Sequence, residues 1–410
     1  MIAYRLGIYF YYLFIKFASL FNEKARLWIE GRKAQASLYS SQLEKTSRVW
    51  FHFASLGEFE QGRSMIEYFK SNHPHYKIVI TFFSPSGYEL RKNYPAEKVY
   101  YLPLDTPANA KAFINHLQPS IAIFNKYEYW HYMMRELHER QIPFFVSSAI
   151  FRKNQLFFKW YGWFNRKTLG YVNHFFTQNI ESDKLLESID HENFTMAGDT
   201  RFDRVYEHSL TVKDDEKILQ FAANEKVFVA GSTWPADEKL ILELIAANKE
   251  LKFIIVPHEI KAEKIQQLYN NFKSEALLYS NFERDFSADK KILIVDNVGL
   301  LSGIYHIAHI CYIGGGFGKG IHNTLEAATF GKPVIFGPNY TKFQEAKDLI
   351  KRSAAFSINT SADLKNITER LLSDENYYQQ ASNSAREYVL EKKGATEVIM
   401  NYLKQLQYIQ

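Results

Sequence analysis

The chain has 410 residues, of which 46% are hydrophobic and 23% are charged, and its formal net charge at pH 7 is +5. This length exceeds what one compact core usually holds, so we expect two domains, and the composition excludes a disordered or repetitive chain. The single cysteine, Cys311, excludes an internal disulfide, and the modest charge disfavours a nucleic-acid partner. No Cys-x-x-Cys or His-Glu-x-x-His spacing occurs, so a zinc site is not predicted.

Aromatic and apolar residues are concentrated near the start of the chain, over residues 7–21. Lys16 interrupts this run, which is shorter than the ~20 residues that a membrane-spanning helix needs. No small-residue cleavage site follows, so a signal peptide is not predicted. We favour an anchor on the cytoplasmic leaflet over an amphipathic helix packed on the protein's own body, because basic residues flank the run. These are Arg5, Lys24, Arg26, Arg32 and Lys33.

A second aromatic segment spans residues 157–176 and is interleaved with Lys159, Arg166 and Lys167. This pattern is typical of a belt at a membrane interface. It is equally typical of a buried helix whose cations reach outward to water, and both interpretations stay open.

Short β-branched and aromatic runs alternate with longer helical stretches such as residues 60–71 and 236–248. The runs are continuously apolar, which suits parallel strands buried on both faces. The pattern therefore predicts an α/β fold with two doubly wound, Rossmann-like domains facing each other across a cleft. The candidate strands are residues 49–53, 77–83, 121–124, 144–148 and 174–177, then 227–230, 253–256, 292–295, 310–313 and 334–336.

The polar stretch at residues 205–216 separates the two series of strands and is the predicted domain boundary. We expect a membrane-associated segment at residues 1–35, an acceptor-binding domain at 36–210 and a nucleotide-binding domain at 211–410. The last helix, from about Asn376, is expected to cross back over the first domain.

The richest candidate site is the glycine-rich run at residues 313–338, IGGGFGKGIHNTLEAATFGKPVIFGP. Glycines let the backbone approach a ligand closely, and free N–H groups at a helix start near Asn323 attract phosphate. Glu326 would then reach a ribose hydroxyl. The simpler interpretation is that Asn323 and Glu326 only cap the helix.

A second candidate site follows the first strand, at residues 52–58 (HFASLGE). Gly57 would permit a tight strand-to-helix turn that leaves Glu58 at the carboxyl edge of the sheet, where α/β ligands bind. A carboxylate there can act as a general base toward a hydroxyl. The alternative is a first-turn glutamate that only stabilises its helix.

These two segments together resemble the family of Kdo (3-deoxy-D-manno-octulosonic acid) transferases. Further matches occur in the expected order between them, so the resemblance covers nearly the whole chain. They are residues 81–87 (TFFSPSG), 101–105 (YLPLD), 197–203 (AGDTRFD) and 230–233 (AGST).

The resemblance implies an inverting, metal-independent B-type glycosyltransferase (GT-B fold) that needs no cofactor. It would move Kdo from CMP-Kdo to a lipid A precursor at the inner membrane, during lipopolysaccharide synthesis, with its body in the cytoplasm. It implies Glu58 as the general base. Implied donor-binding residues are Ser232, Thr233, His258, Gly314, Gly315, Gly316, Gly318, Lys319, Asn323 and Glu326. Implied cleft or acceptor residues are Ser55, Gly57, Ser84, Ser86, Glu128 and Arg201.

Three positions depart from the family pattern. Lys126 stands where the family often has an acid, although Glu128 and Trp130 remain. His258 follows Pro257 where an arginine is expected, and Ile321 interrupts the second glycine pair. These departures put individual donor contacts in doubt.

Two other functions remain open. One is a GT-B enzyme that uses a UDP-sugar, and the other is a non-catalytic membrane scaffold with this fold. We also expect basic pairs in the first domain to meet the acceptor's phosphates, although solvated surface cations are the simpler interpretation. The pairs are Arg91 with Lys92, and Arg152 with Lys153.

Overall fold

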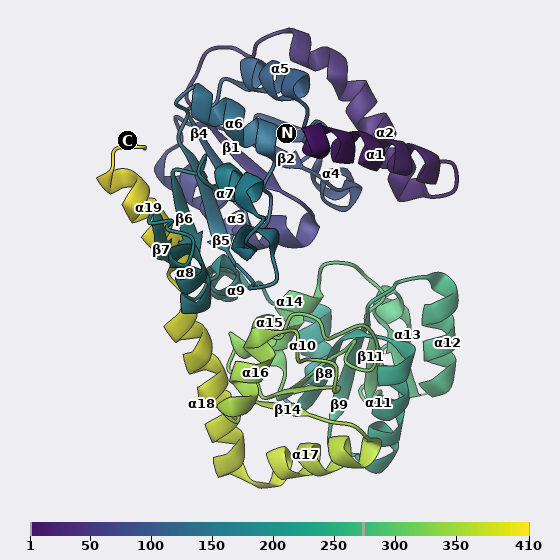
Figure 1. Cartoon of the computed structure of the whole chain (residues 1–410). Helices are drawn as coiled ribbons and strands as arrows, with labels where there is room; N and C mark the ends of the chain where they lie inside the picture. Colours follow the sequence, from purple (N-terminus) through teal and green to yellow (C-terminus); the bar gives the residue numbers. More distant parts are fainter. Residues whose placement is uncertain (1, 273–274, 410) are drawn as a thin grey trace. The chain divides into compact units, whose positions relative to one another are not determined.

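The computed structural model describes residues 2–272 and 275–409. It divides into two compact units, coloured by sequence in Figure 1. The first unit contains Met1–Arg204 and Lys393–Gln410, and the second contains Val205–Lys392. The division after Arg204 falls just before the polar stretch at 205–216, and the chain returns to the first unit at Lys393.

The first unit is built on a seven-stranded sheet in the order β3-β2-β1-β4-β5-β6-β7. Its strands are β1 (Arg48–Phe53), β2 (Lys77–Phe82), β3 (Lys98–Tyr101), β4 (Ile121–Asn125), β5 (Phe144–Ala149), β6 (His174–Thr177) and β7 (Phe194–Met196). Its helices are α1 (Ile2–Ala18), α2 (Glu23–Ala36), α3 (Leu56–Asn72), α4 (Pro85–Arg91), α5 (Pro107–Leu117), α6 (His131–Glu139), α7 (Trp163–Leu169), α8 (Ile180–Glu187) and α19 (Ala395–Gln405), with single 3₁₀ turns at Ser37–Ser40 and Leu156–Phe158. Helix α9 (Thr200–Thr211) runs across the division.

The second unit has a seven-stranded sheet in the order β10-β11-β9-β8-β12-β13-β14. Its strands are β8 (Val227–Thr233), β9 (Lys252–Pro257), β10 (Ala276–Leu278), β11 (Ile292–Ile294), β12 (Ile310–Ile313), β13 (Val334–Phe336) and β14 (Ala355–Ser357). Its helices are α10 (Glu216–Ala222), α11 (Pro235–Ala247), α12 (Ala262–Phe272), α13 (Phe282–Asp285), α14 (Leu301–Ile304), α15 (Leu325–Ala328), α16 (Gln344–Lys351), α17 (Ser361–Ser373) and α18 (Glu375–Lys392), with 3₁₀ turns at Tyr279–Asn281 and Tyr305–Ile307.

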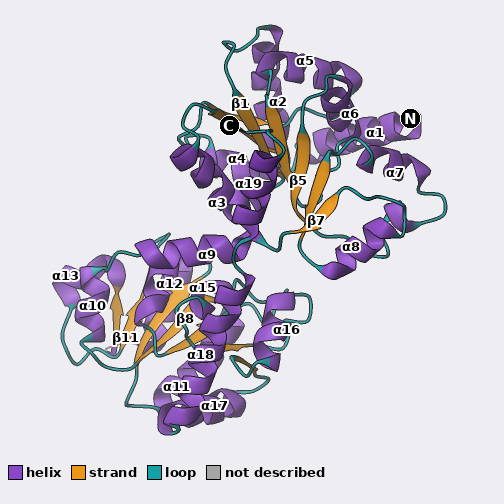
Figure 2. Cartoon of the chain, turned by 90° about the vertical axis from the view of Figure 1, so that its left-hand side faces the viewer, coloured by secondary structure: helices purple, strands orange, loops and turns teal. Residues whose placement is uncertain are grey.

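The continuous apolar strands follow from burial on both faces. Along β1, Trp50 packs into one core cluster, whereas Phe51 and Phe53 belong to the cluster that contains residues of α3. Helices therefore cover both faces of the sheet, and adjacent strands such as β1 and β2 pair in parallel (Figure 2). The predicted pair of doubly wound α/β domains is confirmed.

The C-terminal helix α19 completes the core of the first unit. It lies along α3 (Figure 2), and its residues Ile399, Met400 and Leu403 are buried in the same cluster as Phe51. The carboxylate of Asp203 accepts hydrogen bonds from the amides of Gly394 and Thr396 at the start of this helix. The expected helix from about Asn376 is thus two helices, α18 and α19, and α19 is the one that packs on the first unit.

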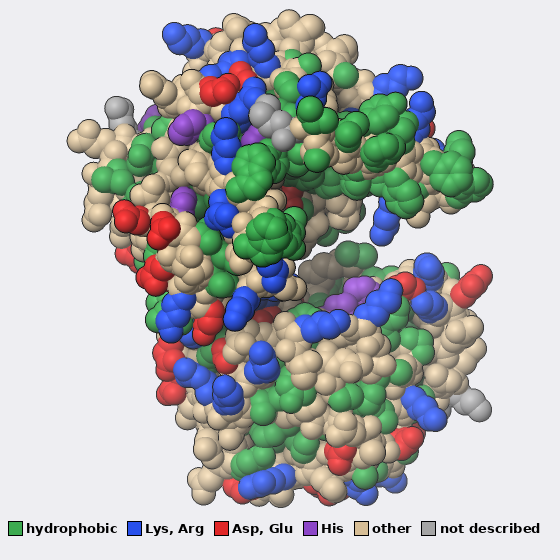
Figure 3. Space-filling model, in the orientation of Figure 1, with side chains coloured by type: hydrophobic (Ala, Val, Ile, Leu, Met, Phe, Trp, Pro, Cys, Tyr) green, Lys and Arg blue, Asp and Glu red, His purple; other side chains and the backbone are tan. Residues whose placement is uncertain are grey.

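The N-terminal helix α1 has no buried residue and exposes a row of large apolar side chains. Among the helices of the described residues, none combines the length and the apolar character needed to cross a membrane. Tyr4 fastens the start of α1 by donating a 2.6 Å hydrogen bond to Asp105. Figure 3 shows hydrophobic side chains gathered on the end of the first unit that carries α1 and α2. The exposed side chains of α1 and its following turn include Phe10, Phe14, Phe17, Leu20 and Phe21.

The second aromatic segment, residues 157–176, has both buried and exposed aromatic side chains, so each of the two interpretations applies to part of it. Phe157 and Leu169 are buried in the core, whereas Trp160 and Trp163 are 90% and 64% exposed. The segment therefore contributes both to the core and to an exposed aromatic surface.

Candidate functional site

The carboxyl ends of the strands in the first unit bring four predicted segments to one edge of the sheet. These are the turns that follow β1, β2, β3 and β4, and β1 lies between β2 and β4. Backbone hydrogen bonds tie the turns together, since the Ser84 amide donates to the Ala54 carbonyl. Glu58 and Glu128 therefore stand on neighbouring turns.

Glu58 lies in the first turn of α3, and its side chain folds back toward β1. Its Oε2 accepts a 2.7 Å hydrogen bond from the amide of Ala54, so the glutamate does stabilise the helix start. Burial and then the negative charge of Glu128 raise the pKa of Glu58 to about 7, although the Ala54 bond opposes this shift. A carboxyl group with such a pKa exchanges a proton easily at neutral pH.

Glu128 is held by two donors that sequence reasoning did not connect to it. His52 Nε2 lies 3.1 Å from its Oε2, and Trp130 Nε1 donates to the same oxygen at 2.7 Å. The buried His52 ring is fixed in turn by the hydroxyl of Thr81 on β2, at 2.8 Å. Three adjacent strands thus position this carboxylate beside Glu58.

The small residues around Glu58 act differently from the expectation for Gly57. Gly57 lies inside α3, outside the left-handed region, and a Cβ there would meet nothing within 4 Å. The tight turn does not require glycine, so the prediction about its backbone was wrong; the residue instead leaves open space beside Glu58. Ser55 is the N-cap position of α3, and Ser84 caps α4 by accepting from the amide of Ser86.

Arg201 is engaged with a carboxylate of its own unit. Asp199 accepts from the Arg201 amide and side chain, both at 2.9 Å, and from Gln61 at 2.5 Å. Burial would raise the pKa of Asp199, but the charges of Arg201 and Lys126 outweigh it and hold the pKa below its usual range. The bond to Asp199 uses some of the N–H donors of Arg201, so fewer of them are available to an anionic ligand.

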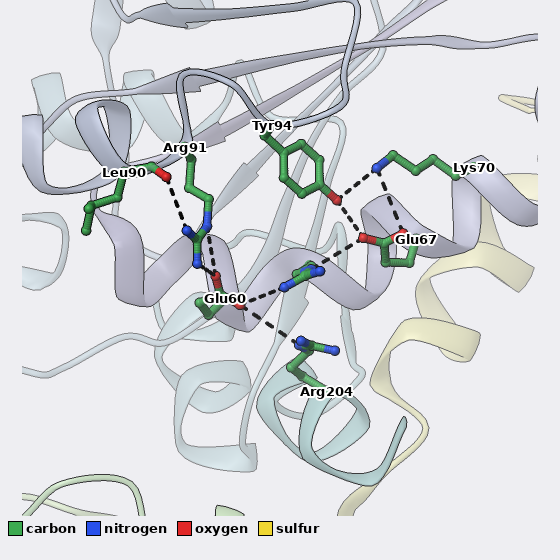
Figure 4. A network of polar contacts seen from close by, with 8 residues as sticks. Glu60, Glu67, Lys70, Leu90, Arg91, Tyr94 and Arg204 are labelled. Atoms are coloured by element: carbon green, nitrogen blue, oxygen red, sulfur yellow. Dashed lines mark hydrogen bonds and ion pairs between the residues drawn. The ribbon is translucent and has the colours of Figure 1, made fainter. Parts of the chain in front are cut away.

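The basic pair Arg91 and Lys92 is also engaged within the first unit. Arg91 donates to Glu60 at 2.7 Å within the network of Figure 4, and Lys92 donates to Glu89 at 2.9 Å. This favours a structural role for the pair. Arg152 differs, because it lies over the ring of Tyr127 and near its hydroxyl.

The glycine-rich segment of the second unit follows β12 and needs glycine for two physical reasons. A Cβ on Gly314 would lie 2.2 Å from the Ser232 carbonyl, and one on Gly316 would lie 2.6 Å from Gly337. Gly315 and Gly320 have φ values of +91° and +143°, which other residues rarely adopt. Gly318 and Lys319 are exposed at the outer end of the loop.

Several amides of this loop are bonded within the second unit. The amide of Gly314 donates to Gly231, and those of Gly318 and Gly320 donate to the Gly315 carbonyl. The amide of Gly315 donates to Asp237 at 2.9 Å. The loop is thus a folded structure with its own bonds, and only its remaining groups could meet a ligand.

Asp237 is the main support of the loop, and the sequence analysis missed it. It is fully buried, and its carboxylate accepts from the amides of Gly315 and Trp234 and from the hydroxyl of Tyr312. The available signal was its position three residues after Trp234, with Pro235 between them, which marks a capping carboxylate at the start of α11.

Asn323 and Glu326 bond to each other at the start of α15, whose N-cap residue is Thr324. Asn323 donates to Glu326 at 3.0 Å and accepts from the amide of Leu325 at 3.1 Å. Helix α15 begins at Leu325, two residues after Asn323, and it ends at Ala328. Such a short helix has only a small dipole, which weakens the expected attraction of phosphate to its start.

Ser232 and Thr233 end β8 next to this loop. The pairing of β8 with β9 shifts between Gly231 and Thr233, and Ser232 has a φ of +54°. Irregular backbone of this kind at a sheet edge often re-aims a side chain near a functional site. The hydroxyl of buried Thr233 donates to Glu238 at 3.1 Å, so Ser232 is the better placed of the two to meet a ligand.

His258 belongs to an aromatic cluster that the sequence did not reveal. Its ring stacks on Trp234 and on His322, with centroid separations of 4.8 and 4.3 Å, while Trp234 Nε1 donates to His322 Nε2. Burial lowers the pKa of His322 to about 4, so this ring accepts as neutral imidazole. His258 is exposed on top of the cluster.

Comparison with known proteins identifies the relatives of this architecture. A UDP-GlcNAc 2-epimerase from Neisseria meningitidis superposes with a TM-score of 0.63 at 15% identity, over 87% of this chain and 100% of that one. MurG from Acinetobacter baumannii superposes with a TM-score of 0.54 at 10% identity, over 88% and 99%. At these identities the likeness concerns the fold alone.

Sequence relatives indicate the class of the protein. A 3-deoxy-D-manno-octulosonic acid transferase of Haemophilus influenzae is 27% identical over 371 residues, which cover 87% of this chain and 86% of the relative. Another, of Chlamydia trachomatis, is 25% identical over 80% and 79%. With its two Rossmann-like units, the chain is a glycosyltransferase of the GT-B class. Its residues 26–204 match the family model of 3-deoxy-D-manno-octulosonic-acid transferases (kdotransferases).

Proposed function

We propose that this protein transfers Kdo from CMP-Kdo to a lipid A precursor, with inversion at the anomeric carbon and without a metal ion. The observation that carries the proposal is Glu58, a carboxyl group with a pKa of about 7 at the carboxyl edge of β1, with open space at Gly57 beside it. Glu58 would take the proton of the acceptor hydroxyl as that oxygen attacks the anomeric carbon. The CMP phosphate would leave from the opposite face, and a single displacement inverts the centre.

The second unit would hold the donor. The exposed Gly318 and Lys319 and the half-buried Ser232 stand at the glycine-rich edge and would contact the phosphate, with His258 close by. Asn323 and Glu326 would exchange part of their mutual bond for the ribose hydroxyls. Fixed donors of this kind stabilise the charge that develops on a leaving phosphate.

The membrane surface would supply the acceptor. Helix α1 exposes an apolar row, Trp160 and Trp163 are exposed on the same unit, and Tyr4 contacts Phe164 of α7. These side chains would lie in the cytoplasmic face of the inner membrane and hold the catalytic unit at its lipid substrate.

A direct assay tests the proposed reaction. Purified protein is incubated with CMP-Kdo and a tetra-acylated lipid A precursor, with CMP release and product mass as readouts. We expect CMP release that depends on the acceptor, and a product heavier by one or more Kdo residues. Turnover of a UDP-sugar without any use of CMP-Kdo would overturn the proposal.

The pH dependence of the reaction should report Glu58. Because the base must be ionised, kcat/KM is expected to rise with pH up to about 7 and then level off. In Glu128→Gln the negative charge that helps to raise the pKa of Glu58 is removed, so the acidic limb should move to lower pH. A pH–rate profile of both proteins checks this, and identical limbs would contradict it.

A further inference from the structure

A cavity in the first unit is separate from the groups described so far. It has a volume of about 620 Å³ and lies among α1, α2, the 3₁₀ turn that follows α2, the segment after β3, and α5. This volume is in the range of sites that bind small molecules. Its walls are mostly apolar and include Tyr12, Trp28, Leu104 and Ala112, with Arg32 and Lys33 as the cations.

Arg32 is a half-buried cation without an acidic partner in the described part of the chain. Its guanidinium donates to the carbonyls of Leu102, Phe83 and Trp28, and lies 3.7 Å from the centre of the Trp28 ring. Burial lowers its pKa to about 9, and the ionisable groups that oppose this shift are tyrosines. A partly desolvated cation on a mostly apolar wall gains from a counter-charge, so the cavity favours a ligand that brings an anion.

Trp28 supplies a second unsatisfied group on the wall of this cavity. The residue is only 4% exposed, and its Nε1–H is buried with no hydrogen-bond partner among the described residues. Buried indole N–H groups normally find an acceptor. Arg32 therefore favours a ligand with anionic oxygens next to an apolar body, whereas the Trp28 N–H has no accessible surface and could meet such a ligand only after the indole moves.

The cavity adjoins the edge of the sheet that carries Glu58. Arg32 bonds the residues that directly follow β2 and β3, whereas Glu58 follows β1, the strand beside β2. Neighbouring strands lie ~5 Å apart, so the two sites are separated by about one to two strand spacings. The rings of Phe83 and Trp130 stack at 4.6 Å and continue from Arg32 toward Glu128.

The opposite side of the cavity is formed by the helices that carry the exposed apolar surface. Tyr12 on α1 lines the cavity, while Phe10 and Phe14 on the same helix are exposed. Figure 3 shows apolar side chains and Lys or Arg side chains at this end of the unit. A lipid that leaves a bilayer at α1 would meet the cavity before it reaches Glu58.

We propose that this cavity binds an acyl chain of the lipid acceptor and that Arg32, assisted by Lys33 at the rim, pairs with a phosphate of the same lipid. The inference rests on the proposed function, which it deepens by assigning the acceptor's lipid part to a subsite. The acceptor hydroxyl would then be presented to Glu58 by a lipid held at two further points.

The first test measures binding of a monomeric probe, dihexanoyl phosphatidic acid, to the full-length protein by calorimetry. Ala112→Trp places an indole in the cavity from α5, and it should weaken binding at least tenfold. Ala108→Trp is the matched control, because Ala108 lies exposed on the same helix and does not line the cavity. Arg32→Met should abolish the preference for the phosphatidic acid over dihexanoyl phosphatidylcholine. If this variant does not fold, Ala112→Trp decides the matter.

The second test separates the acceptor from bulk phospholipid. With the tetra-acylated precursor, Ala112→Trp should raise the acceptor KM at least tenfold and leave the KM of CMP-Kdo and sedimentation with phosphatidylglycerol vesicles unchanged. Equal binding of the probe by Ala112→Trp and Ala108→Trp would overturn the inference, even if transfer occurs. If Ala112→Trp also lost binding to phosphatidylglycerol vesicles, the inference would be overturned, because the cavity would then bind a bilayer lipid and not the acceptor. Probe binding as expected without any Kdo transfer would instead contradict the proposed function alone.

Discussion

Replacing Glu58 by glutamine is expected to lower the rate of transfer by roughly 10²–10⁴-fold, the usual contribution of a general base. Glutamine has the same shape and keeps an oxygen that can accept from the Ala54 amide, so the start of α3 should stay intact. The loss would then reflect the missing proton acceptor and not a damaged helix. Single-turnover rates with CMP-Kdo and acceptor measure it, and calorimetric binding of CMP-Kdo should be unchanged.

Glu60→Gln is the matched control for this substitution. Glu60 lies two residues further along α3 and is paired with Arg91 (Figure 4). The rate of transfer by the Glu60→Gln protein should therefore differ from that of the unchanged protein by no more than a few-fold. A Glu58→Gln protein with a near-normal rate would leave Glu58 as a helix cap only and would remove the main support for the proposed mechanism.

Replacing Asp237 by alanine is expected to destabilise the second unit by about 3–5 kcal/mol. Each buried donor that loses its acceptor costs about 1–3 kcal/mol, and this carboxylate serves the amides of Trp234 and Gly315 and the hydroxyl of Tyr312. Because Gly315 is released, the glycine-rich loop should also lose its shape, and affinity for CMP should fall. Urea unfolding and calorimetric titration with CMP measure the two effects.

Two further variants make this prediction specific. Asp237→Asn keeps an oxygen for the two amides, while its amide nitrogen can face the Tyr312 hydroxyl, so its loss of stability should be clearly smaller. Asp289→Ala removes an exposed aspartate and should change stability by less than about 0.5 kcal/mol. Equal stability of the alanine variants at positions 237 and 289 would contradict a supporting role for Asp237.

The strands and the fold class could be predicted because their cause is local. A strand such as β1 is buried at every position when helices cover both faces, so it is mostly apolar, and that pattern is visible in Val49, Trp50, Phe51 and Phe53. The glycine-rich run was equally visible, since close backbone contacts at Gly314 and Gly316 admit no larger residue.

The partners of the site residues could not be predicted, because they come from distant positions. His52 at the end of β1 bonds to Glu128, which follows β4. Asp237 on α11 accepts from the amide of Gly315 in the loop after β12. The pKa of Glu58 depends on burial and on Glu128, neither of which its own segment reveals. The internal bonds of the glycine-rich loop were hidden for the same reason, since a run of glycines does not indicate which of its N–H groups the fold itself uses.

The return of residues 393–410 to the first unit makes the second unit an insertion within the first. A ribosome releases residues 205–392 before α19, whose buried side chains Ile399, Met400 and Leu403 complete the core around β1. The second unit can therefore finish folding while the first still exposes an apolar groove along α3. The core around β1 is therefore completed only once α19 has been synthesised.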